Sequence, residues 1–324
     1  MTNLNPAVLV LEDEAPPPQL ASIERLADVR HTREAGLAEA LPGAEVLFLW
    51  DFWSDAVAAA WPHADSLRWV HVASAGVDRL LFPALVESDV VVTNSRGVFD
   101  EPIAEYVLGL VLCFAKDLHT TLRLQDRREW RHRETERITG ARVLVVGTGP
   151  IGRAIGRRLS AAGMAVAGIG RVGRPADPDL GDVRPFGELP SALAEADYVV
   201  LAAPLTDLTR DMIDAAALAR MRPSARLINV GRGGLVVEKA LIEALTEGRI
   251  AGAALDVFAA EPLAEFSPLW SLPNVLVSPH MSGDTIGWHD DLVELFVANL
   301  GRYRDGRALM NVVDKQLGYV ARGT

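Results

Sequence analysis

Residues 142–166 read RVLVVGTGPIGRAIGRRLSAAGMAV, an apolar strand pattern followed by a glycine-rich turn and a segment of helical periodicity. The turn has the spacing G-x-G-x-x-G. Its first glycine permits a tight turn, its second lets a pyrophosphate approach the backbone, and its third lets helix and strand pack closely. The first turn of the helix also offers N–H donors to an anion. We therefore expect a dinucleotide-binding unit with cofactor contacts at Gly147, Gly149, Pro150, Ile151 and Gly152.

Short apolar runs alternate with helical segments on both sides of this stretch. Four runs precede it, at 7–11, 45–50, 68–73 and 90–94, and the series that starts at 141–147 continues at 164–170, 197–204, 225–231, 250–258 and 274–280. This alternation predicts an α/β protein with two doubly wound parallel sheets that helices cover on both faces. Long helical patterns at 100–125 and about 284–304 flank the second series, which suggests two crossings between two domains.

Composition limits the function classes. A chain of 324 residues exceeds the usual size of one hydrophobic core. The 43 acidic and 32 basic residues give a net charge of −11, which disfavours nucleic acid or an anionic membrane as partner. The single cysteine, Cys113, excludes an internal disulfide and a cysteine-based metal site, and we expect no metal. No apolar run has the length of a membrane span, and the N-terminal residues turn acidic at once, so we expect a cytoplasmic protein.

The position that reads the ribose should follow the second strand of the dinucleotide unit. A carboxylate there would bind the 2′-hydroxyl of NAD, but this chain has Gly170, with Arg171 and Arg174 close behind. Two guanidinium groups without a carboxylate favour a 2′-phosphate. We expect NADP(H) to be preferred and NAD(H) to be possible. The alternative is that both arginines are solvated loop residues.

Three side chains with complementary chemistry follow successive strand patterns. Arg232, Glu261 and His280 each come after an apolar run, where the ligands of an open α/β sheet bind. Reduction of a 2-keto acid needs a cation for the carboxylate, a proton donor for the carbonyl oxygen, and a carboxylate that favours the protonated donor. Each residue alone has an ordinary structural explanation. Together, beside a nucleotide site, they indicate a catalytic triad.

With these residues in place, the chain resembles the D-isomer-specific 2-hydroxyacid dehydrogenase family. The matching stretches run in the family's order: ASAGVDRL (73–80), VTNSRGVFDEPIAEYVLGLVL (92–112), GTGPIGRAIGRRL (147–159), APLT (203–206), LINVGRGGLV (227–236), ALDVFAAEP (254–262) and SPHMSG (278–283). The resemblance implies a flavodoxin-like substrate domain made of residues 1–98 and 287–324. A Rossmann cofactor domain, residues 99–286, would be inserted between them.

The resemblance also implies roles for individual residues. Arg232 would bind the substrate carboxylate, and His280 paired with Glu261 would be the general acid and base. Backbone N–H groups of Ser74, Ala75 and Gly76 would bind the same carboxylate. Further cofactor contacts are expected at Ala203, Pro204, Leu205, Val230, Gly231, Asp256, His280, Ser282 and Gly283. Family members pair as homodimers through the cofactor domain.

Departures from the family pattern leave more than one function open. Ile103 stands before Ala104-Glu105, where the family commonly has threonine, so one polar cofactor contact is missing. The leading interpretation is a reductase of a small 2-keto acid such as glyoxylate or hydroxypyruvate. One alternative is an NAD-dependent dehydrogenase of a bulkier D-2-hydroxy acid, whose pocket Trp50, Phe52 and Trp53 would line. Another is a dinucleotide-sensing scaffold similar to the family's transcriptional corepressors.

Overall fold

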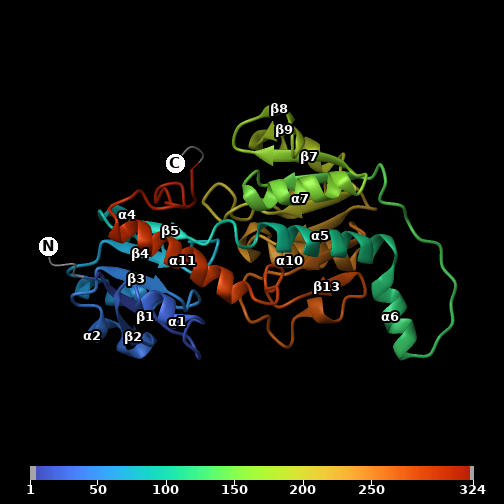
Figure 1. Ribbon diagram of the computed structural model, residues 1–324. Coiled ribbons are helices and arrows are strands. Elements are labelled where there is room, and N and C mark those ends of the chain that lie inside the picture. Colours follow the sequence, from blue (N-terminus) through green and yellow to red (C-terminus); the bar gives the residue numbers. More distant parts are fainter. Residues whose placement is uncertain (1–4, 322–324) are drawn as a thin grey trace. The chain divides into compact units, whose positions relative to one another are not determined.

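The computed structural model describes residues 5–321. The chain divides into two compact units, each with its own sheet (Figure 1). The first unit contains the residues up to Val98 and those from Thr285 onward, and the second is Phe99–Asp284.

The first unit has a five-stranded parallel sheet in the order β2-β1-β3-β4-β5, which is the flavodoxin-like order. Its strands are β1 (Ala7–Leu11), β2 (Asp28–Thr32), β3 (Val46–Leu49), β4 (Trp69–Val72) and β5 (Val91–Asn94). Its helices are α1 (Leu20–Glu24), α2 (Leu37–Ala40), α3 (Ala56–Ala60), α4 (Pro83–Glu87) and α11 (Trp288–Arg304).

Alternating side chains of this sheet pack on two different faces. On one face Phe296 of α11 stacks on Phe48, with ring centroids 4.0 Å apart, and on Trp69. The other face forms a core with α2, α3 and α4, which includes Leu9, Leu47, Val70, Leu37, Val57 and Leu85. The strand patterns are continuously apolar because both faces are covered.

The second unit has an eight-stranded sheet in the order β13-β12-β11-β10-β6-β7-β9-β8, parallel except for β8 against β9. Its strands are β6 (Arg142–Val146), β7 (Ala165–Gly170), β8 (Arg174–Asp177), β9 (Gly181–Pro185), β10 (Tyr198–Leu201), β11 (Arg226–Asn229), β12 (Gly252–Leu255) and β13 (Val275–Val277). The strand order reverses between β6 and β10, as in a Rossmann fold. The predicted fold class is confirmed.

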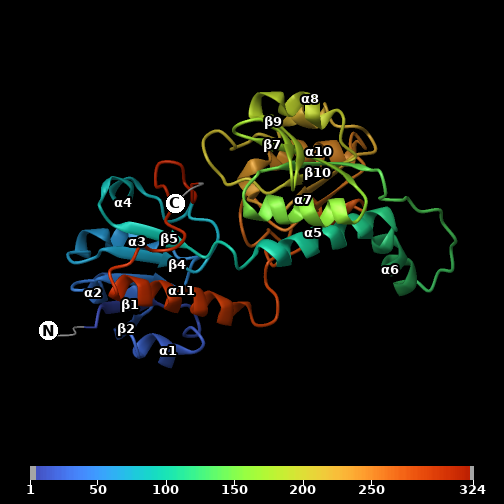
Figure 2. The same ribbon diagram turned by 45° about the horizontal axis from the view of Figure 1, so that its top comes forward.

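Helices cover both faces of this second sheet. They are α5 (Asp100–Ala115), α6 (Leu118–Asp126), α7 (Pro150–Ala161), α8 (Leu189–Leu193), α9 (Ala215–Leu218) and α10 (Glu238–Thr246). Helices α8, α9 and α10 share a core with β6, β10 and β11, and α5 runs beside α7 (Figure 2). Within residues 5–321, no helix combines the length and the apolar character needed to cross a bilayer.

The single long helix predicted for 100–125 is wrong. The structure has two helices there, α5 and α6, and Asp117 between them has a φ of 49°. The left-handed conformation interrupts the helix, and aspartate tolerates it better than most residues. The side chain of Arg133 donates to the carboxylate of Asp117 and holds this break in place.

Candidate active site

The carboxyl ends of five adjacent parallel strands form one edge of the second sheet. Strands β13, β12, β11, β10 and β6 are neighbours in this order, so the loops that follow them meet at this edge. The loops contain the expected site residues of the second unit apart from those after β7, namely the glycines after β6, Ala203–Leu205, Val230–Arg232, Asp256–Glu261 and Ser278–Gly283. This is the edge at which open α/β sheets bind ligands.

The glycine loop after β6 has the shape that a dinucleotide needs. Gly147 has a φ of 114°, and a Cβ there would lie 2.5 Å from the carbonyl oxygen of Ala202. A Cβ on Gly152 would lie 1.9 Å from the oxygen of Gly147. By contrast, a Cβ on Gly149 would meet no atom within 4 Å, so open space lies in front of this backbone. The N–H groups of Ile151 and Gly152 begin α7 without intrahelical acceptors, so the loop fits a pyrophosphate.

The structure brings His280 and Glu261 together. Nδ1 of His280 donates to Oε2 of Glu261 at 2.9 Å, and the N–H of Phe258 donates to Oε1 at 2.8 Å. Burial by itself would raise the pKa of Glu261, but these hydrogen bonds and the nearby charge of Arg232 lower it below its usual value. The carboxylate is therefore ionised near neutral pH, and Arg232 lies close enough to act on it.

Arg232 follows β11 at a point where the backbone is tightly packed. The side-chain amide of Asn229 donates to the carbonyl of Arg232 at 2.9 Å. A Cβ on Gly233 would lie 1.9 Å from the backbone of Phe258, so glycine is required there. The close approach joins the loop of Arg232 to the loop that precedes Glu261.

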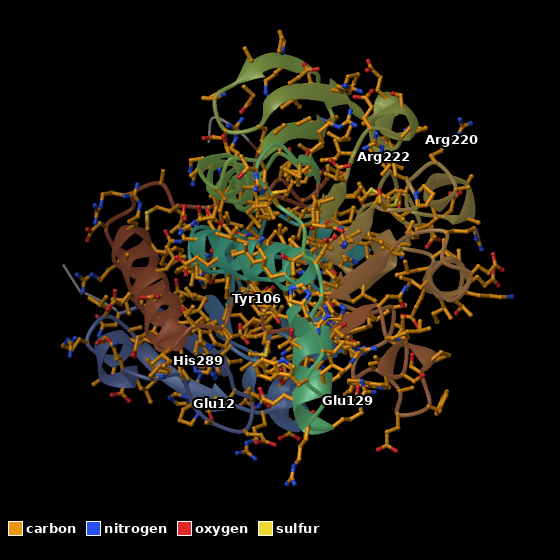
Figure 3. The ribbon with its side chains drawn as sticks, turned by 90° about the vertical axis from the view of Figure 1, so that its right-hand side faces the viewer. Glu12, Tyr106, Glu129, Arg220, Arg222 and His289 are labelled. Carbon is orange, nitrogen blue, oxygen red and sulfur yellow. The ribbon has the colours of Figure 1, made fainter. Side chains whose placement is uncertain are left out.

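Asp256 holds the loop that carries His280. Its carboxylate is buried and accepts hydrogen bonds from the hydroxyl of Ser278 at 2.7 Å and from the N–H groups of Met281 and Ser282, both at 3.0 Å. The hydroxyl of Tyr106 on α5 (Figure 3) hydrogen-bonds to Ser278. The expected contact of Asp256 with a nicotinamide stays a prediction, since its carboxylate already has three donors within the unit.

The ribose-reading position is crowded as well as uncharged. A Cβ on Gly170 would lie 3.0 Å from Oγ1 and Cγ2 of Thr148. Arg171 is exposed, whereas Nε of Arg174 donates to Asp177 at 3.2 Å. Asp177 also accepts two hydrogen bonds from Arg153 of α7. Sequence reasoning missed Asp177 and Arg153, because a lone aspartate in a loop gives no signal of its partner.

The loop after β4 presents an unusual row of donors in the first unit. Within residues 5–321, the N–H groups of Ser74, Ala75 and Gly76 donate to no protein acceptor, while the carbonyls of all three accept hydrogen bonds. Consecutive backbone N–H groups without a protein acceptor are available to bind an anion. This arrangement is what the predicted carboxylate-binding role requires.

The other expected cofactor residues lie in the edge loops. Ala203 and Val230 are buried, and the hydroxyl of Thr209 donates to the carbonyl of Pro204 at 2.6 Å. Ser282 is buried next to Asp256, and a Cβ on Gly283 would lie 2.7 Å from the ring of Phe99. Leu205 and Gly231 lie in the same loops, next to Pro204 and Val230. The contacts of all these residues with a cofactor stay predictions.

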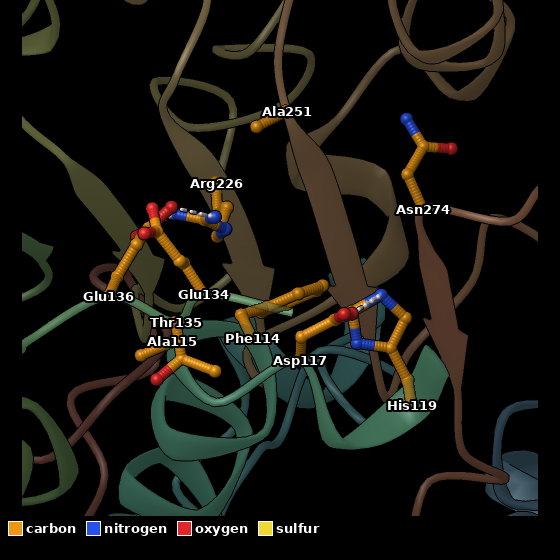
Figure 4. A pocket seen from close by; sticks show the side chains of 10 residues that line it. All are labelled: Phe114, Ala115, Asp117, His119, Glu134, Thr135, Glu136, Arg226, Ala251 and Asn274. Atoms are coloured by element: carbon orange, nitrogen blue, oxygen red, sulfur yellow. Dashed lines mark hydrogen bonds and ion pairs between the residues drawn. The ribbon is translucent and has the colours of Figure 1, made fainter. Parts of the chain in front are cut away.

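A cavity of about 270 Å³ lies elsewhere in the second unit (Figure 4). Its lining includes Arg226, Ala251 and Asn274, which mark the amino ends of β11, β12 and β13. The cavity is therefore at the opposite edge of the sheet from the glycine loop and His280. It is no part of the candidate active site.

Comparison with known proteins identifies the family of the chain. The model of the D-isomer specific 2-hydroxyacid dehydrogenase NAD-binding domain matches residues 108–282. The chain belongs to the D-isomer-specific 2-hydroxyacid dehydrogenase family. Among its relatives, the glyoxylate reductase of Thermococcus gammatolerans is 34% identical over 266 residues, which cover 79% of this chain and 78% of the relative.

Solved structures of the family have the same fold. The D-isomer specific 2-hydroxyacid dehydrogenase of Xanthobacter autotrophicus Py2, in complex with NADPH, is 32% identical, with a TM-score of 0.82 over 97% of this chain and 100% of that one. The NADPH-dependent glyoxylate/hydroxypyruvate reductase of Sinorhizobium meliloti, in complex with NADP, is 27% identical, with a TM-score of 0.84 over 97% and 100%. This chain is an NAD(P)-dependent oxidoreductase of 2-hydroxy acids, so the predicted family, enzyme class and dinucleotide cofactor are confirmed.

Proposed function

We propose that this dehydrogenase is an NADPH-preferring reductase of small 2-keto acids of the glyoxylate or hydroxypyruvate type, which yields D-2-hydroxy acids. The observation that carries the proposal is the hydrogen bond from His280 to Glu261 beside Arg232, at the sheet edge of the glycine loop. The glyoxylate reductase names of its relatives support the substrate class.

Each side chain of the triad has one task. The bound dinucleotide supplies the hydride. Arg232 binds the substrate carboxylate and orients the carbonyl. In the first unit, the N–H groups of Ser74, Ala75 and Gly76 offer donors to a carboxylate. Because Nδ1 of His280 donates to Glu261, Nε2 is the atom that gives a proton to the carbonyl oxygen in reduction and takes it back in oxidation. Glu261 stabilises the protonated ring.

The preference for NADPH rests on charge and space after β7. Gly170 carries no carboxylate that would repel a 2′-phosphate. The side chain of Thr148 leaves little room for a side chain at position 170. Arg171 is exposed and cationic. Arg174 is the weaker part of the proposed clamp, because its Nε donates to Asp177, its Nη1 donates to the carbonyl of Val172 at 3.4 Å, and its Nη2 is buried. Relatives of the same fold bind NADP and NADPH.

A second candidate substrate class has its own observation. Trp50 lies 5.2 Å from His289 between ring centroids, and Phe52 lies 6.3 Å from Trp288. Together with Trp53 they form an aromatic group after β3 and at the start of α11. Such a group favours a 2-keto acid with a larger apolar side chain.

We also propose that the enzyme is a cytoplasmic homodimer that pairs through the cofactor domain. Helix α6 and the loop 127–139 carry exposed apolar side chains, namely Leu118, Leu122 and Trp130. Exposed apolar groups of this size favour a protein partner, for which a second copy of the chain is the simplest choice. The single cysteine suits a reducing compartment.

A panel of 2-keto acids assayed with NADPH and NADH in parallel tests the proposed function. We expect the highest kcat/KM with glyoxylate or hydroxypyruvate and NADPH. Higher kcat/KM with phenylpyruvate would establish the bulkier substrate class instead. Absence of turnover with every keto acid and both cofactors would contradict the proposal and favour a sensing role.

A further inference from the structure

The three carbonyl groups of the carboxylate-binding loop, residues 74–76, are all held from within the first unit. The N–H of Ser95 donates to the carbonyl of Ser74 at 2.9 Å, and Nδ2 of Asn94 donates to that of Ala75 at 2.6 Å. The hydroxyl of Ser74 donates to the carbonyl of Gly76 at 2.6 Å. The carbonyl of one residue and the N–H of the next share one planar peptide. These bonds therefore set the directions of the N–H groups of Ala75, Gly76 and Val77, and the bond from Asn94 sets that of Gly76.

Asn94 is the only side chain beyond the loop itself, among the described residues, that binds a loop carbonyl. It ends β5 directly beside Val72, the last residue of β4, and it is buried. Its Oδ1 accepts from the N–H of Arg96 at 3.3 Å, so the amide nitrogen points toward Ala75. The backbone of Asn94 is tied to Asn311 through both its N–H and its carbonyl.

Ser95 is anchored by a buried chain of polar groups. Nε1 of Trp69 donates to the hydroxyl of Thr93 at 2.8 Å, and this hydroxyl donates to Nδ1 of His71 at 2.7 Å. Burial lowers the pKa of His71 to about 3, so its ring is neutral and carries its proton on Nε2, which faces the hydroxyl of Ser95. A fully satisfied buried network of this kind is rigid.

We propose that Asn94 is a positioning residue for substrate binding, which presets the peptide between Ala75 and Gly76 so that the N–H of Gly76 faces the carboxylate of the 2-keto acid. The inference rests on the proposed function, because it takes a 2-keto acid as the ligand. Donors that are oriented before the ligand arrives lose no binding free energy to reorganisation. Asn94 itself does not touch the substrate.

The variant Asn94→Asp tests this role, because it keeps the shape and the acceptor for Arg96 but loses the donor to Ala75. We expect KM for the preferred keto acid to rise about tenfold, since the partly buried carbonyl of Ala75 loses its donor. The dissociation constant of NADPH, measured by fluorescence, should not change. The increase in KM should become smaller toward pH 5. The carboxyl group introduced at position 94, once protonated, can donate to the carbonyl of Ala75 as the amide does in the wild type.

Asn299→Asp is the matched control. Asn299 is a buried asparagine of the same unit, and its Nδ2 donates to the carbonyl of Met310 at 3.1 Å, which is not a carbonyl of the loop. We expect this variant to lower the melting temperature and leave KM unchanged. Equal KM changes in both variants, or a wild-type KM for Asn94→Asp, would overturn the proposal.

Hydrogen exchange separates this inference from the proposed function. The amide of Ser95 donates to the carbonyl of Ser74, so its exchange reports how firmly the loop is held. This amide should exchange faster in Asn94→Asp than in the wild type or in Asn299→Asp, whether or not the enzyme reduces the keto acids tried. Unchanged exchange overturns the positioning role by itself. A wild-type enzyme without keto-acid turnover overturns the proposed function before any variant is made.

Discussion

His280 combines an uncommon backbone conformation with a side chain that is held at one ring nitrogen. Its φ is 52°, in the left-handed region, and its N–H donates to the carbonyl of Asp256 at 2.8 Å. Non-glycine residues rarely adopt this conformation unless surrounding contacts impose it, and such residues cluster at functional sites. The backbone and Glu261 together fix the direction of Nε2.

Replacement of His280 by alanine should lower kcat by about 10²–10⁴-fold, since general acid catalysis is worth this much. The dissociation constant of NADPH should stay within about twofold of wild type. Stopped-flow reduction and a fluorescence titration measure the two quantities. His63→Ala, at an exposed histidine of the first unit, is the control. A His280→Ala enzyme with nearly full kcat would remove His280 from the mechanism.

The prediction that tests the preference for NADPH most directly concerns Arg171. Arg171→Ala should weaken NADPH binding by about tenfold, because a charge-assisted bond to phosphate contributes about 1.5 kcal/mol or more. NADH binding should hardly change. Arg220→Ala, at an exposed arginine that follows α9 (Figure 3), is the control for loss of charge. Equal weakening of both cofactors, at fixed ionic strength, would show that Arg171 does not read the phosphate.

The site residues that could be predicted from the sequence are those whose side chain indicates a role without knowledge of its partners. Arg232, Glu261 and His280 stand out because each follows a strand and suits a step of keto-acid reduction. Asn94 and Asp177 do not stand out, since their importance lies in partners such as Ala75 and Arg153, 19 and 24 residues away. Such contacts depend on packing that a single sequence does not display.

At the scale of elements, the strands with an apolar pattern could be predicted from the sequence, and those with a polar pattern could not. All runs of continuously apolar residues became strands, because a strand buried on both faces needs them. Strand β2, with the sequence DVRHT, lies at the edge of its sheet and is mostly exposed, so its pattern is polar. The hairpin of β8 and β9 contains proline, aspartate and glycine, which predict loops.

This β8–β9 hairpin is fastened to α7 through Asp177. The carboxylate is buried and binds Arg153 by two hydrogen bonds of 3.0 and 2.7 Å. Burial alone would raise the pKa of Asp177, but the arginine contacts outweigh it and lower the pKa from 3.8 to about 2. The folded state therefore gains stability from this carboxylate above pH 3.8 and loses it as the pH falls through about 2.

Asp177→Asn should accordingly lower the free energy of unfolding by about 2 kcal/mol near neutral pH. The difference from wild type should shrink progressively below about pH 4, as the unfolded chain binds its proton first. Denaturant titrations over a pH series measure it. Asp182→Asn, at an exposed carboxylate of the same hairpin, should have little effect at any pH. A difference that does not depend on pH would contradict the ion-pair explanation.

At the scale of the whole molecule, the proposed dimer depends on α6 and the loop 127–139. Trp130 on this loop is fully exposed, and Glu136 at its far end forms two hydrogen bonds with Arg226. We expect the wild type to have twice the chain mass in light scattering. Trp130→Asp should shift it toward the monomer, whereas Phe266→Asp, at another exposed aromatic residue, should not. A monomeric wild type would refute the dimer.

The configuration of one product, glycerate, reports how the whole enzyme carries out the reaction. Hydroxypyruvate is prochiral, so its reduction reports both turnover and the face of the carbonyl carbon that receives the hydride. Chiral chromatography of the glycerate formed with NADPH tests the central claim most directly. We predict a single product, D-glycerate, in amounts equal to the NADPH consumed. A racemic or L product, or NADPH oxidation without glycerate, would contradict the assignment of Arg232, Glu261 and His280 to D-specific reduction.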